Sequence, residues 1–85
     1  MILTGNHIKA ARALSDHDQE ALADLAGVSV NTVRNMEATG SKPVGGFEST
    51  RSKVQTALEQ MGMEFTNGDS PGVRFVKTRK GKKKV

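Results

Sequence analysis

The sequence predicts a mainly α-helical domain, a compact bundle of four or five short helices that ends in a β-hairpin. Apolar residues recur at helical spacing in four segments, each bounded by a capping residue or a glycine. After Gly62 the period changes to two, in two short segments separated by a cluster of turn formers. The chain of 85 residues has room for one domain. We place it at residues 1–76, before a basic tail at 77–85 that we expect to be disordered.

The first helix is predicted over residues 3–15. Thr4 can cap its N-terminus, and the apolar residue before this cap can pack on Ile8 as a hydrophobic staple. Ile8, Ala11 and Leu14 recur at roughly helical spacing and form the predicted buried stripe. The polar stretch 15–18 then ends the pattern.

The second helix is predicted over residues 19–26. Asp18 is a good N-cap, and Gly27 stands where a helix ends with positive φ. The expected apolar stripe of this helix consists of Leu22, Leu25 and Ala26.

The third helix is predicted over residues 30–39. Ser29 is its N-cap and Gly40 ends it. Val33 and Met36 are spaced by three, so we expect one buried face and an opposite face that points outward.

A loop at 41–46 precedes a longer helix, predicted over residues 48–61. Its expected apolar face consists of Val54, Ala57, Leu58 and Met61, extended by Phe47 and Thr50. Residues 63–66 and 73–76 alternate apolar with polar side chains around the turn formers at 67–72, which predicts a hairpin. Because an isolated hairpin is marginal in water, it must pack on the helices or pair with another chain.

The second and third predicted helices have the spacing of a helix-turn-helix unit, in which a turn of three or four residues joins two short helices. Ala23 supplies the small residue that close helix crossing needs, and Gly27 supplies the turn. Val28, Val33 and Met36 can anchor the second helix of the unit.

The segments QEALA at 19–23, GVS at 27–29 and TVRNME at 32–37 resemble the Cro and phage-repressor (XRE-type) family, as does IKAARAL at 8–14. The resemblance covers residues 4–40 closely. It implies a lambda-repressor-like fold that binds double-stranded DNA. The later helix and the hairpin are similar to a small bacterial subgroup more loosely.

The resemblance also implies which side chains meet the DNA. The residues that would face base edges are Val30, Asn31, Arg34 and Asn35. Those that would hold phosphates are Gln19, Ser29, Thr32 and Lys42. The chemistry suits these roles, because Asn can bond adenine, Arg can bond guanine, and Val can contact a thymine methyl. The N-terminus of a helix also favours an anion.

Arg12 and Glu37 match a pair that bonds across the motif in this family, so we expect a structural ion pair. Glu37 is then not a catalytic acid. The alternative is that both side chains are solvated and that the pair contributes about 0–1 kcal/mol to the stability of the fold.

The expected function is that of a sequence-specific DNA-binding transcriptional regulator, a repressor that reads an inverted-repeat operator with the helix starting near Ser29. We expect a homodimer, joined through the last helix, the hairpin or both, because the core is small and the strand edges are exposed. The alternative is a protein-interaction module, an antitoxin or antiactivator on the same scaffold. Residues 1–76 favour that alternative mildly, since they carry 7 basic and 9 acidic residues, and the remaining 6 basic residues lie in 77–85.

Other classes of function are not expected. Ser15, Asp16 and His17 are adjacent and cannot converge as a catalytic triad, so we predict no enzyme. The chain has no cysteine, and the two histidines and nearby aspartates fit no known ligand spacing, so we predict neither metal nor cofactor. No segment reads as a signal peptide or a membrane span, which predicts a cytoplasmic protein.

Overall fold

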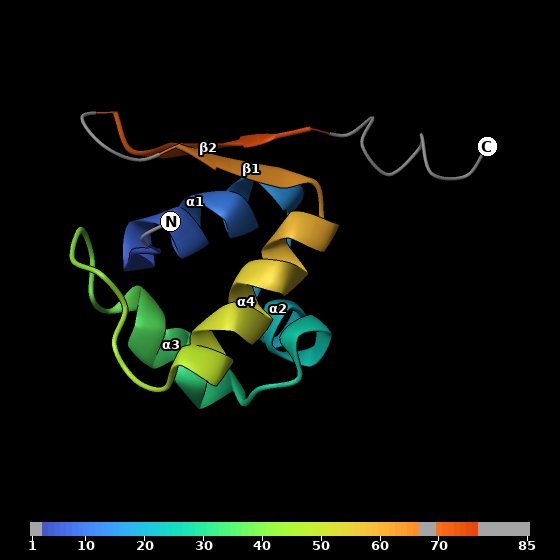
Figure 1. Cartoon of the computed structure of the whole chain (residues 1–85). Coiled ribbons are helices and arrows are strands. Elements are labelled where there is room, and N and C mark those ends of the chain that lie inside the picture. The colour runs from blue at the N-terminus through green and yellow to red at the C-terminus, as the bar shows by residue number, and fades with distance from the viewer. Residues whose placement is uncertain (1–2, 67–69, 77–85) are drawn as a thin grey trace.

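The computed structural model describes residues 3–66 and 70–76 of the chain, and within them it contains four helices and one two-stranded antiparallel sheet. The elements are α1 (Gly5–Ser15), α2 (Gln19–Ala26), α3 (Val30–Glu37), α4 (Glu48–Gln60), β1 (Met63–Thr66) and β2 (Gly72–Phe75). The hairpin covers α1 at one end of the molecule, and α3 lies toward the other (Figure 1). The prediction of a mainly α-helical fold with a hairpin is confirmed. The predicted tail at 77–85 lies outside the described residues.

The core is shared by all four helices and the first strand. Its largest fully buried side chains are Ile8, Leu22, Val33, Val54, Leu58 and Met63. Each helix contributes at least one of them, and Val54 and Leu58 of α4 are spaced by four, as one buried face requires. A core drawn from so many elements holds these short helices together, because isolated helices of this length are marginal in water.

Polar caps fix the start of the first three helices, as the sequence predicts. The side chains of Thr4, Asp18 and Ser29 accept hydrogen bonds from the backbone N–H groups three residues on, at 3.2, 2.8 and 3.1 Å. Gly27 ends α2 with φ of 74°, the left-handed conformation that suits glycine. The sharp turn from α2 into α3 is thus set by local chemistry.

Two leucines that the helical spacing places in buried stripes are instead exposed. Leu25 is 54% exposed because the buried stripe of α2 consists of Leu22, Ala23 and Ala26, which puts Leu25 roughly 100° around the helix from its centre. Leu14 is 48% exposed, since only Gly5, His7, Ile8 and Ala11 of α1 are buried.

The end of α3 and the start of α4 also differ from expectation. The third helix stops at Glu37 rather than at Thr39, because the N–H groups of Thr39 and Gly40 bond three residues back, to Met36 O and Glu37 O, in a tighter turn. The start of α1 lies against this turn, where Asn6 N–H donates to Gly40 O at 2.9 Å. Phe47 does not extend the buried face of α4. It is the N-cap residue, before the first turn, and it is 80% exposed.

The hairpin packs on α1, one of the two possibilities that the sequence left open. Phe65 pairs with Val73 across the strands and meets the His7 ring edge-on, with centroids 5.6 Å apart. His7 is buried and completes a capping box with Thr4, whose N–H donates to His7 Nδ1 at 3.1 Å. Because Nδ1 acts as an acceptor, Nε2 is the nitrogen that donates to Thr66 O, at 3.3 Å.

Candidate nucleic-acid interface

The outer face of α3 carries polar side chains that the core leaves free. Asn31, Arg34 and Asn35 are exposed, whereas Val33 and Met36 on the opposite face are buried. Three of the four residues expected to face base edges therefore share one accessible surface. The described residues offer Arg34 no ion-pair partner.

Val30, the fourth of these residues, lies differently. It is half-buried and packs against the core. It stands one turn before Val33 and thus only about 60° around the helix from the buried face. The prediction that Val30 faces outward is therefore wrong in part, because one side of its side chain packs on the core.

The first turn of α3 brings two hydroxyl groups together. Ser29 Oγ lies 2.9 Å from Thr32 Oγ1 and also accepts the Thr32 backbone N–H. Ser29 is exposed and Thr32 is half-buried. The first N–H groups of a helix have no intrahelical partner, so this end of α3 presents donors and a positive partial charge.

Arg12 and Glu37 form a two-pronged ion pair between α1 and the end of α3. Arg12 donates from Nε to Oε2 at 2.6 Å and from Nη2 to Oε1 at 3.0 Å. Its remaining terminal nitrogen donates to His17 O at 3.1 Å, beside the start of α2. The Glu37 side chain is only 4% exposed. The pair thus locks the three N-terminal helices against one another.

The environment of Glu37 keeps its carboxylate ionised. Burial acts to raise the pKa of Glu37, but the hydrogen bonds from Arg12 and Gln19 and the charge of Arg12 outweigh it, so the pKa lies below its ordinary value. The hydrogen bond to Glu37 in turn raises the pKa of Arg12, against the effect of its own burial. A carboxyl group held in this state is not a general acid at neutral pH.

Gln19 joins the cluster of Arg12 and Glu37, a contact that the spacing of residues in the sequence does not predict. Its Nε2 donates to Glu37 Oε1 at 3.1 Å, and the residue is half-buried at the first position of α2. No periodic signal could have revealed a bond between two side chains so far apart in the sequence.

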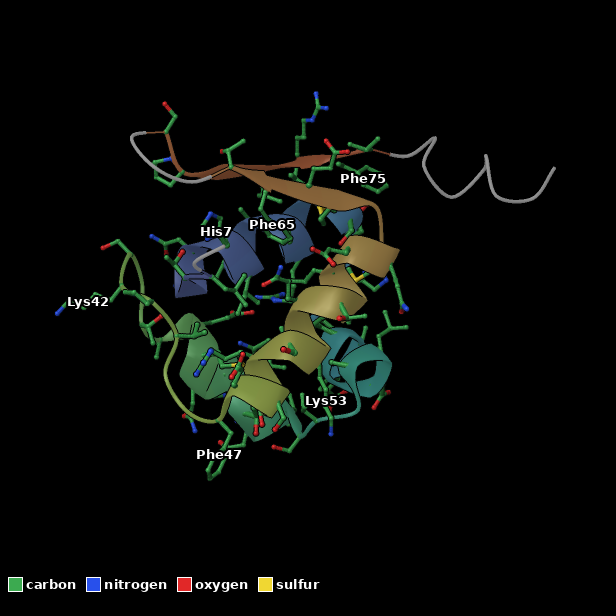
Figure 2. The ribbon with its side chains drawn as sticks, viewed as in Figure 1. His7, Lys42, Phe47, Lys53, Phe65 and Phe75 are labelled. Atoms are coloured by element: carbon green, nitrogen blue, oxygen red, sulfur yellow. The ribbon has the colours of Figure 1, made fainter. Side chains whose placement is uncertain are left out.

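Lys42 stands on the loop between α3 and α4, exposed and directed away from the helices (Figure 2). The loop is tied to the segment before α1, where Val44 N–H donates to Leu3 O at 2.9 Å and Thr4 bridges to Pro43. Lys42 is therefore a cation on an anchored loop.

An open hollow of about 360 Å³ lies between α3 and the start of α4. Thr32, Asn35 and Met36 line one side of it, and Phe47 and Thr50 line the other. Phe47, predicted to extend the buried face of the helix, lies at this surface instead. Its position at an N-cap, where polar residues are usual, is the signal that could have identified it.

Two classes of site are not seen in the described part of the chain. Within residues 3–66 and 70–76, His, Asp and Glu side chains form no group of three that could hold a metal ion. No helix among these residues is both long and apolar enough to cross a membrane.

Comparison with known proteins adds no family to these observations. The chain matches no family model, and it matches no curated protein. The surface on α3 must therefore be interpreted from its own side chains.

Proposed function

We propose that this chain is a sequence-specific DNA-binding regulator of the helix-turn-helix type, similar to the Cro and phage-repressor family, with α3 in the major groove. The observation that supports this most directly is the outer face of α3. Asn31, Arg34 and Asn35 are exposed together there on a helix whose other side is anchored in the core. The major groove of B-DNA is about 12 Å wide and admits such a helix.

These side chains can read base edges. Arg34 can donate two hydrogen bonds to guanine, and Asn31 or Asn35 can pair with adenine in a bidentate way, each worth about 1–3 kcal/mol of discrimination. Val30 is half-buried, so it contributes at most a methyl contact from its outer side.

Phosphate contacts would flank this surface. Ser29 and Thr32 lie at the positive end of α3, and Lys42 supplies a cation on the following loop. Gln19 gives one amide hydrogen to Glu37, which leaves its second for a phosphate oxygen. Such contacts position the protein on the duplex, whereas base contacts specify the sequence.

We also propose a homodimer that represses transcription by occupying an inverted-repeat operator in the cytoplasm. Two copies related by a two-fold axis would read half-sites about 10 bp apart, or a multiple of that. An apolar groove between α1 and β2, which includes Leu14 and Val73, supports a contact between copies on the hairpin side.

The test is selection of bound fragments from random duplex DNA, followed by titration of variants on the selected operator. Arg34→Ala should relax the preference at one base position and weaken specific binding roughly 10-fold or more, the equivalent of about 1–3 kcal/mol. Lys53→Ala removes one exposed charge from α4 and is the matched control, which should leave base preference unchanged. Failure of the parent protein to select any sequence would refute the proposed function.

The rival function is that of a protein-interaction module, favoured by the net negative charge of residues 1–76. A salt titration separates the two. A specific DNA reader loses affinity with a log–log slope of about −0.9 per phosphate contact. An interaction module would bind DNA only weakly, and deletion of residues 77–85 would abolish that binding.

A further inference from the structure

We infer that Phe47 is a further specificity-determining residue of this surface, and that its ring and the adjoining hollow receive the 5-methyl group of a thymine. The inference rests on the proposed DNA-binding function. It concerns a side chain at the N-cap of α4, outside the helix predicted to face the bases.

The exposure of Phe47 has no structural explanation in the chain itself. Phe47 is 80% exposed, more than any other large apolar side chain that the structure describes. It also occupies the N-cap of α4 without a side-chain hydrogen bond, where Ser, Thr, Asp or Asn would stabilise the helix by about 1 kcal/mol. Neither core packing nor helix capping therefore explains a phenylalanine here.

The backbone holds Phe47 in a defined place. Its carbonyl accepts the N–H groups of Thr50 and Arg51, both at 3.1 Å. The Arg51 side chain reaches back and donates to Gly46 O at 2.6 Å, which closes the turn before the helix. Such preorganisation lowers the entropic cost of a contact made by this ring.

The hollow makes Phe47 continuous with the proposed reading face. Thr32 and Asn35 line the same depression as Phe47, with the buried Met36 beside them. A duplex bonded to Asn35 would thus lie next to the phenyl ring. Among the groups that bases present in the major groove, the thymine methyl is the apolar one, and phenylalanine is among the side chains that contact it.

A second copy of the chain is a poorer occupant of this hollow. A stable protein interface buries about 800 Å² on each partner. One phenylalanine side chain buries about 150–250 Å², which falls well short of that area. The ring also lies at the end of the molecule opposite to Phe75, which stands on the hairpin (Figure 2).

The experiment uses the full chain and the operator that it selects from random DNA. Each thymine is replaced in turn by deoxyuridine, which lacks only the methyl group, and the affinity ratio of the two probes is measured. The parent should lose about fourfold in affinity when one thymine of each half-site is replaced, which is the effect of burying one methyl-sized group. Phe47→Ala should bind the thymine probe about fourfold more weakly and show a ratio of about one at that position, whereas Phe47→Leu should keep part of the ratio. Phe75→Ala, the matched control, should keep the whole of it.

Three outcomes would overturn the inference and leave the proposed function standing. The parent could select an operator yet be insensitive to every thymine replacement. Phe47→Ala could retain the parent's ratio. Phe47→Ala could weaken dimerisation in sedimentation without changing the ratio of affinities for the thymine and deoxyuridine probes. That result would assign the ring to a protein contact. If the parent selects no operator at all, the proposed function fails and the inference falls with it.

Discussion

At Glu37 the fold buries a carboxylate and supplies three hydrogen bonds to it, two from Arg12 and one from Gln19. Removing one partner of such a pair leaves an unpaired charge in a poorly solvated place, which is far more costly than losing an exposed ion pair. The hairpin offers the exposed comparison, since Arg74 and Glu64 pair at 2.8 Å with the arginine largely in solvent.

We therefore predict that Arg12→Met lowers the free energy of unfolding by about 3–5 kcal/mol. Arg74→Met, its matched control, should lower it by less than about 1 kcal/mol. Urea denaturation of both variants measures the difference. Equal losses would show that the buried pair is no more important than the surface one.

The lowered pKa of Glu37 predicts a dependence of stability on pH. Because the folded protein favours the ionised form, Glu37 stabilises the fold at pH values above its ordinary pKa of 4.5 and loses that contribution as the pH falls through the lower folded value. Glu37→Gln should be less stable than the parent by about 2 kcal/mol at pH 7. The difference should shrink below pH 4.5, and a gap that stays constant down to pH 3 would contradict the prediction.

Residue-scale prediction from the sequence succeeded where the signal is local. The caps Thr4, Asp18 and Ser29 all act as expected, because a cap bonds only three residues along the chain. His7 escaped notice because a capping box is normally completed by Glu or Gln. The bond from Gln19 to Glu37 depends on how three helices pack, which no local pattern encodes.

Between elements, the start of α1 lies close against the end of α3. Gly5 N–H donates to Thr39 Oγ1 at 3.0 Å, beside the bond from Asn6 to Gly40. A Cβ on Gly5 would lie 2.5 Å from Glu37 O, which is main-chain and cannot swing aside. The glycine is therefore required by contact with another helix.

This contact predicts that two glycine-to-alanine variants differ in stability. Gly5→Ala would raise helix propensity in an isolated peptide, but the clash should cost the protein about 1–3 kcal/mol. Gly45→Ala, the matched control, adds a Cβ that meets nothing within 4 Å and should change stability by less than about 0.5 kcal/mol. Thermal unfolding monitored by circular dichroism compares the two. A stabilised Gly5→Ala variant would show that α1 can move away from α3.

At the scale of elements, the sequence predicted each helix to within about two residues, because caps and glycines mark the boundaries. It failed for Leu25, since α2 has only about two turns and offers few positions from which to judge its buried side. It failed for Phe47 because this residue lies before the first turn of α4 and not on a face of the helix. The second strand also begins one residue earlier than predicted, at Gly72, where it pairs with Thr66.

For the whole molecule, the strand edges of the hairpin and the groove beside them bear on assembly. Within the described residues each strand of the hairpin pairs only with the other, and the groove beside β2 is lined by Ala10, Ala13 and Leu14 of α1. Exposed apolar surface next to strand edges is typical of a contact between chains.

We predict a dimer at tens of micromolar in sedimentation velocity. Leu14→Glu should shift it toward monomer by placing a charge in the groove. Leu25→Glu changes a similarly exposed leucine on α2 and should leave the dimer intact. A parent protein that sediments as a monomer would exclude this assembly, and equal effects of the two variants would exclude this groove.

The tie between the segment before α1 and the loop after α3 also bears on synthesis by the ribosome. The contacts of Leu3 with Val44 and of Thr4 with Pro43 join residues that are far apart along the chain. A nascent protein that has just completed α3 already contains nearly all the side chains proposed to contact bases. The contacts of Leu3 and Thr4 with the later loop have not yet formed at that stage. Closing a loop of this length carries an entropic cost that only the later contacts offset. A translation product truncated before Pro43 would therefore carry α3 without the contacts that tie Leu3 and Thr4 to the loop after this helix.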